Sequence, residues 1–271
     1  MSMKTNVFTF GAIVAAILAP AHSAIAQTGG INSAPQNKSQ GQVIATFYYS
    51  NSDKGWDRNG RSIDIADYQK VELYLLAEYR ATDELTLIAT PSFRNVSVED
   101  GDDTRGLGYT ELGARYDLAA GEGWTVAAQG TVRIPGSTRQ DNLAQVGNTN
   151  VEYDARLRGT YGFAVGLDSA FIDVQTSYRF RAGDPPNEFH GDVTVGYRPV
   201  SDLLLMAQSF NTISDGRGAG IFDRYRYHNV QLSAVKDVGN GVSIQAGWLG
   251  TVAGENALRE RGFFGGLWVR F

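Results

Sequence analysis

Charged residues occupy alternate positions along several segments of the chain. In the segment 151–161, VEYDARLRGTY, the residues Glu152, Asp154, Arg156 and Arg158 alternate with apolar or small side chains. Carboxylate and guanidinium groups at this spacing can form ion pairs with one another or hydrogen-bond a polar solute. Because successive side chains of a strand point to opposite faces, the pattern predicts one charged face and one apolar face.

The same alternation occurs in neighbouring segments, and we expect the charged side chains of all of them to line one interior. The predicted lumen-lining set is Lys70, Glu72, Glu78, Arg80, Glu111, Arg115, Arg133, Glu152, Asp154, Arg156, Arg158, Asp173, Arg179 and Arg181. Opposite charges on adjacent strands could simply brace this interior. They could also form the wall of a conduit for a hydroxyl-rich or zwitterionic solute, and with both signs present neither anions nor cations are favoured.

Catalysis is not indicated by the sequence. Beyond the N-terminal segment the chain has two histidines, His190 and His228, and neither lies in a G-x-S-x-G setting. The acidic segment 99–104, EDGDDT, lacks the ligand spacing of an EF-hand and is interpreted as a solvated loop tip near lipopolysaccharide. We therefore predict no catalytic residue, no metal site and no cofactor. A lipid-modifying barrel with a Ser–His pair remains the alternative from the enzyme class.

The N-terminus has the features of a secretory signal. Lys4 gives a basic start, the apolar stretch 7–20 is too short to span a bilayer, and Ala24 and Ala26 suit cleavage before Gln27. We expect a signal peptide over 1–26, a flexible periplasmic segment over 27–41 and one domain over 42–271. The chain has no cysteine and a net charge of −5, which fits an exported protein without disulfides and gives no indication of nucleic-acid binding.

The elements that must position the charged residues are strands. Runs with a period of two are separated by connectors that alternate between long, such as 51–67 and 135–150, and short, such as 81–84 and 199–202. This sorting is typical of outer-membrane barrels, which have long extracellular loops and short periplasmic turns. We predict an all-β fold, a transmembrane antiparallel up-and-down β-barrel of about 12 strands, in the bacterial outer membrane, with lipid and lipopolysaccharide as its surroundings.

The last predicted strand, 263–271, ends on an aromatic residue, Phe271. A terminal aromatic on a closing strand resembles the recognition signal of the barrel-assembly machinery, which we therefore expect as a partner.

Several segments resemble the XagA-like outer-membrane proteins. These are GQVIATFYYSNSDKGWDRNGR at 41–61, VELYLLAEYRATDELTLIATPSFRNV at 71–96, GLGYTELGARYDL at 106–118 and YRFRAGDPPNEFHGDVTVGYRP at 178–199. The similarity runs from Gly41 to Phe271 and lies in strand and turn patterning. The resemblance implies a barrel associated with a polysaccharide synthase system for poly-N-acetylglucosamine-type adhesins. A looser likeness exists to transporter barrels linked to the degradation of aromatic compounds.

Function is therefore predicted as a polar channel or export component for an exopolysaccharide, supporting adhesion and biofilm formation. The alternatives are an uptake channel for small hydrophobic or aromatic solutes and a structural barrel without an open pore. A lateral opening and an apolar patch in the lumen would favour uptake, whereas the strongest predicted strands have a charged inward face.

Overall fold

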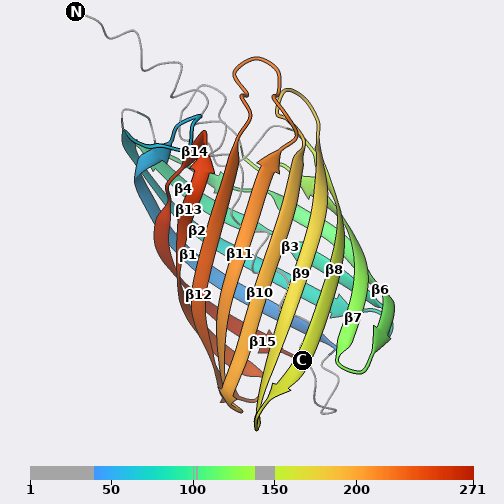
Figure 1. Ribbon diagram of the computed structural model, residues 1–271. Coiled ribbons are helices and arrows are strands. Elements are labelled where there is room, and N and C mark those ends of the chain that lie inside the picture. Colours follow the sequence, from blue (N-terminus) through green and yellow to red (C-terminus); the bar gives the residue numbers. More distant parts are fainter. Residues whose placement is uncertain (1–39, 100, 102, 138–149) are drawn as a thin grey trace, which may run out of the picture.

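The protein is a closed antiparallel β-barrel (Figure 1). The computed structural model describes residues 40–99, 101, 103–137 and 150–271. The expected signal peptide, nearly all of the expected segment 27–41 and most of the long connector 135–150 lie outside these residues. Among the residues that the structure describes, no helix is long and apolar enough to cross a membrane.

The described strands follow one another around the barrel. They are β1 (Gly41–Trp56), β2 (Ser62–Arg80), β3 (Leu85–Thr90), β4 (Ser92–Val98), β5 (Thr104–Leu107), β6 (Thr110–Gly121), β7 (Trp124–Ile134), β8 (Glu152–Val165), β9 (Asp168–Arg181), β10 (Glu188–Val200), β11 (Leu203–Ser214), β12 (Arg226–Gly239), β13 (Val242–Glu255), β14 (Ala257–Leu258) and β15 (Arg261–Arg270).

Three barrel strands are interrupted, which reconciles the 15 described segments with 12 barrel strands. Pro91, which has no N–H to donate, separates β3 from β4, and both of these pair with β2. Gly108 and Tyr109 separate β5 from β6, and 259–260 separate β14 from β15. Since β1 pairs with both β2 and β15, the barrel is closed. The prediction of an all-β barrel of about 12 strands is confirmed.

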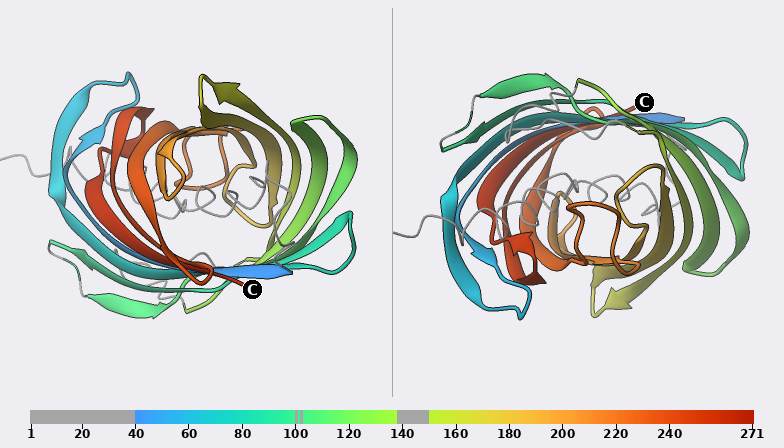
Figure 2. Two further views of the ribbon diagram at one scale, coloured as in Figure 1. Left: turned by 90° about the horizontal axis from the view of Figure 1, so that it is seen from below. Right: turned by 90° about the horizontal axis from the view of Figure 1, so that it is seen from above.

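Alternation along the strands places apolar side chains outside, and on the strands richest in charge it places polar side chains inside. In β8, Tyr153 and Leu157 are about half exposed on the outer face, whereas Glu152 and Asp154 are buried. An outer apolar face suits hydrocarbon, and a closed ladder satisfies the backbone polar groups that hydrocarbon cannot. Figure 2 shows the barrel from its two ends, with β12 to β15 (orange to red) and β6 to β8 (green) on different sides of the lumen.

Short turns gather at the end of the barrel where the chain ends (Figure 1), and by the rule for outer-membrane barrels this is the periplasmic end. Asn240 and Gly241 form one such turn, between β12 and β13. Both have positive φ, 53° and 76°, as a two-residue type I′ hairpin turn requires.

The expected long loop 51–67 is wrong in extent. The first hairpin continues as paired strand beyond the barrel wall, with Gly55 opposite Ile63, and only 57–61 form the turn. Asp57 closes this turn, because its Oδ1 atom accepts hydrogen bonds from the backbone N–H groups of Asn59 and Arg61, both at 2.8 Å. The hydrogen bond from the backbone of Arg61 is the main cause that lowers the pKa of Asp57.

Phe271 lies at the barrel seam. Its backbone exchanges two hydrogen bonds with Gly41, N to O at 3.0 and 2.9 Å, and its ring lies where a side chain at position 41 would project. Its recognition by the assembly machinery stays a prediction.

Candidate channel lumen

The charged side chains expected to line the interior are nearly all buried inside the barrel. Arg80 differs, because it is exposed at the periplasmic end of β2, and Glu111 is partly exposed. The remaining members of the set are buried. The strands that contain buried charged side chains are β2, β4 and β6 to β10. We call this side of the lumen the charged wall.

The extracellular part of the charged wall is a network around two carboxylates, Glu152 and Glu188. Arg181 joins them, with Nε 2.8 Å from Glu152 Oε1 and Nη1 3.1 Å from Glu188 Oε1. Arg179 Nη1 lies 3.2 Å from Glu188 Oε2, and Arg133 pairs with Glu152. A buried charge without a partner costs several kcal/mol, so the network persists because its arginines and carboxylates compensate one another.

Further ion pairs continue along the charged wall. Arg94 Nε lies 2.8 Å from Glu72 Oε1 and Arg115 Nη1 lies 2.8 Å from Glu78 Oε1. In the next strands, Arg158 Nε lies 2.5 Å from Asp173 Oδ2, and Arg156 Nη1 lies 2.9 Å from Asp192 Oδ2. These pairs join different strands and therefore brace the wall across its ladders.

Sequence reasoning missed several members of this network. Glu188 and Asp192 continue the alternation on β10, a signal that was available but was weakened by the glycines of that strand. Arg94 lies on β4, just after Pro91, which interrupts the barrel strand and with it the alternating pattern. Glu260 lies between β14 and β15 and binds Lys70, with Nζ 2.8 Å from Oε1, and no local pattern could have indicated that contact.

His190 lies within the charged wall and links a hydroxyl to a carboxylate. Its Nδ1 atom is 3.2 Å from Thr212 Oγ1 and its Nε2 atom is 2.9 Å from Glu188 Oε2, which is the order of groups in a catalytic triad. The Glu188 carboxylate also forms ion pairs with Arg179 and Arg181. The side chains of Thr212, His190 and Glu188 are all buried. This arrangement serves as a brace. The second histidine, His228, contacts Asn211 Oδ1 through Nδ1 at 2.7 Å.

The opposite side of the lumen has a different chemistry. Among the described residues of β1, β11, β12, β13 and β15, no buried side chain is charged. Instead this side contributes most of a buried apolar cluster on the lumen wall toward the periplasmic end. The apolar lumen cluster is Ile44, Tyr48, Tyr74, Leu76, Ile88, Phe171, Leu204, Met206, Val235, Leu249, Phe264 and Trp268. The lumen therefore has one charged wall and one uncharged wall with an apolar patch.

Two aromatic rings of the apolar lumen cluster lie directly on glycines. A Cβ atom added at Gly196 would come within 1.7 Å of the Phe171 ring, and one added at Gly247 would come within 2.3 Å of the Phe264 ring. Each ring is on the cross-strand partner of its glycine. Glycine thus lets each ring pack directly on the backbone of the neighbouring strand, a close approach that a side chain at that position would prevent.

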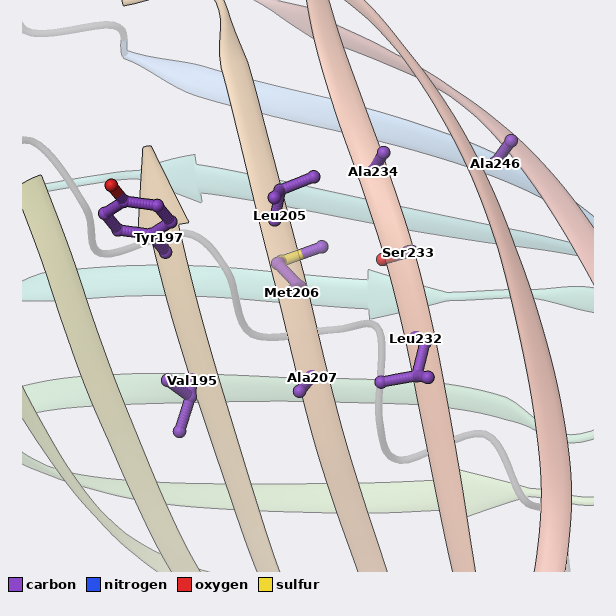
Figure 3. A pocket seen from close by; sticks show the side chains of 9 residues that line it. All are labelled: Val195, Tyr197, Leu205, Met206, Ala207, Leu232, Ser233, Ala234 and Ala246. Atoms are coloured by element: carbon purple, nitrogen blue, oxygen red, sulfur yellow. The ribbon is translucent and has the colours of Figure 1, made fainter. Parts of the chain in front are cut away.

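A shallow groove of ≈ 550 Å³ lies on the outer face of the barrel, over β10 to β13 (Figure 3). Val195, Leu205 and Leu232 form its exposed sides, and the small side chains of Ala207, Ala234 and Ala246 form its floor. This groove faces lipid rather than the lumen. Within the described residues, no group of three or more His, Asp or Glu side chains could hold a metal ion.

Closure, the apolar outer face and the polar lumen define an outer-membrane β-barrel. Its fold is similar to that of the COG4313 outer membrane channel from Pseudomonas putida F1, with a TM-score of 0.70 and 18% sequence identity over 85% of this chain and 95% of that chain. It is less similar to the KdgM porin in complex with disordered oligogalacturonate, with a TM-score of 0.51 and 12% identity over 84% of this chain and 99% of that chain. This fold supports an outer-membrane location.

The chain belongs to the family described as "Putative MetA-pathway of phenol degradation", whose sequence model matches residues 23–271. Comparison with curated protein sequences gave no match. The structural neighbours named above are a channel and a porin rather than enzymes. The resemblance to XagA-like proteins and its link to an exopolysaccharide stay predictions.

Proposed function

We propose that this barrel is a passive outer-membrane channel for the uptake of small apolar solutes, aromatic compounds included. The observation that carries the proposal is the apolar lumen cluster, which covers the uncharged wall toward the periplasmic end. The charged wall faces it and keeps polar groups available on the other side of the same lumen. A solute with an apolar body can therefore leave water and contact the apolar side chains of the cluster inside the barrel.

The energy available from such contacts is sufficient to concentrate a small solute. Fully burying a phenylalanine-sized apolar group is worth about 1.5–3 kcal/mol, which corresponds to roughly 10- to 200-fold in occupancy. A barrel of about 12 strands lies between filled eight-stranded barrels and open porins of 16 strands or more, so its lumen suits small molecules. The family description, which names phenol degradation, and the similarity of the fold to an outer membrane channel from Pseudomonas putida F1 agree with this proposal.

Export of an exopolysaccharide fits this lumen less well. A passing polysaccharide presents hydroxyl groups around its whole circumference and must hydrogen-bond the wall on every side, or lose those bonds to water. The apolar lumen cluster offers a chain of sugars few hydrogen-bond partners where it covers the wall toward the periplasmic end.

The test is uptake by intact cells of a Gram-negative host whose general porins have been deleted. Initial uptake of radiolabelled phenol, at micromolar concentration, is compared between cells with the protein and cells with an empty vector. The variant Leu204→Gln places a polar group in the cluster, and Gln208→Asn, on the same face of β11 but outside the cluster, is the matched control. We expect faster uptake with the protein, a severalfold loss in L204Q and no change in Q208N. Equal uptake with and without the protein would refute the proposal.

A further inference from the structure

Two arginines lie next to the apolar lumen cluster at the periplasmic mouth. Arg270 follows Trp268 by two positions on β15, and Arg198 follows Gly196, on which the Phe171 ring lies, by two positions on β10. A separation of two places a side chain on the same face of a strand. Both arginines therefore belong to the next inward layer, between the cluster and the periplasm, and both are partly buried.

Arg270 is held in place by its neighbours. Its Nη2 atom donates to Ser243 Oγ at 3.0 Å, and its guanidinium carbon lies 6.0 Å from the centre of the Trp268 ring. Its contact with a carboxylate is long, since Nη1 lies 3.9 Å from Asp237 Oδ2. The guanidinium group is thus oriented by a hydroxyl and a ring, and its charge is only weakly compensated.

Arg198 has still less compensation. Within the described residues its side chain forms no ion pair, whereas each buried arginine of the charged wall lies within 3.5 Å of a carboxylate. Arg198 lies just before the turn that joins β10 to β11, and Asp237 lies at the same periplasmic end of β12, beside Arg270. At this end the charge of Arg270 opposes that of Arg198, and the carboxylate of Asp237 partly offsets it. Two positive charges and one negative charge leave a surplus of positive charge beside an apolar surface.

We propose that Arg198 and Arg270 form a carboxylate-binding site, and that the solutes of this channel include small apolar monocarboxylates, such as arylcarboxylates. A guanidinium group binds a carboxylate through two parallel hydrogen bonds. The apolar body of such a solute contacts Trp268 and the cluster, while its carboxylate supplies the negative charge that the mouth lacks. This inference rests on the proposed function, because it specifies the chemistry of the solute at the same lumen.

The test compares two solutes of similar size, benzoate and benzyl alcohol, of which only the first carries a charge at pH 7. Initial uptake of each is measured in the porin-deleted host well below saturation, for the protein and for Arg198→Gln, Arg270→Gln and the double variant. Lys236→Gln is the control, because it removes a positive charge near the same end, from an exposed side chain that pairs with Asp202 on the outer rim. Equal electrophoretic mobility of the folded forms shows that each variant has assembled.

We expect benzoate uptake to fall about tenfold in the double variant, which corresponds to ~1.4 kcal/mol, while benzyl alcohol uptake and the K236Q control stay unchanged. Unchanged benzoate uptake in the double variant would overturn the carboxylate site and leave the channel for apolar solutes standing. An equal fall for both solutes, or an equal fall in K236Q, would also overturn the site. If the protein accelerates uptake of neither solute, the proposed function itself fails.

Discussion

Replacement of Glu152 by glutamine tests the charged wall most directly. Glu152 is 1% exposed, binds Arg181 Nε at 2.8 Å and pairs with Arg133. Glutamine keeps the volume and one acceptor oxygen, but it removes the negative charge that the guanidinium groups of Arg133, Arg179 and Arg181 share. Removing one partner of a buried ion pair costs about 3–5 kcal/mol, and the retained acceptor places the expected loss of unfolding free energy near the lower end, ~3 kcal/mol.

The assay is reversible unfolding in urea with the purified protein in detergent micelles, followed by tryptophan fluorescence. Asp64→Asn is the control, because Asp64 pairs with Lys54 at 2.6 Å outside the barrel wall and its side chain is 88% exposed. The control should leave the unfolding free energy nearly unchanged, because exposed ion pairs contribute little to stability. In the pair E152Q and Arg181→Gln, the double variant should lose less than the sum of the two single losses, since the two residues share one interaction. A loss in E152Q as small as that in D64N would refute the view that the wall is held by desolvated ion pairs.

Three further results are expected. Gly196→Ala forces a methyl group into an aromatic ring and should lower the unfolding free energy by about 1–3 kcal/mol, whereas Gly159→Ala, where a Cβ meets no atom within 4 Å, should be tolerated in the same urea titration. The lowered pKa of Asp57 means that its contribution is present above the ordinary carboxyl pKa and is lost as the pH falls through the lowered value, so amide exchange in the turn 57–61, corrected for intrinsic rates, should accelerate only at strongly acidic pH. Deletion of Phe271 should reduce the amount of folded barrel in cells while refolding into detergent stays unchanged, and equal amounts in cells would contradict a role in assembly.

The strand faces could be read from the sequence because they are a local property. On β8, a period of two separates Glu152 and Asp154 from Tyr153 before any neighbour is known. In an outer-membrane barrel the apolar face of a strand contacts lipid and the polar face lines the lumen, which assigns the two faces. The barrel class and the approximate strand number followed from the same pattern together with the sorted connectors. The extent of the first hairpin did not, because beyond the membrane both faces of a strand meet water and the alternation no longer separates them.

The identity of the partners was decided only by the tertiary structure. Lys70 meets Glu260 because closure of the barrel brings β2 and the last strands together through β1, and no local pattern encodes closure. The apolar lumen cluster escaped detection for a related reason. On β11, Leu204 and Met206 face inward and Leu205 faces outward, so apolar side chains occupy both faces and the period of two carries no information. The sequence determined which side chains each strand offers to the lumen, whereas register and closure decided which of them meet, and so separated a charged wall from an uncharged wall with an apolar patch.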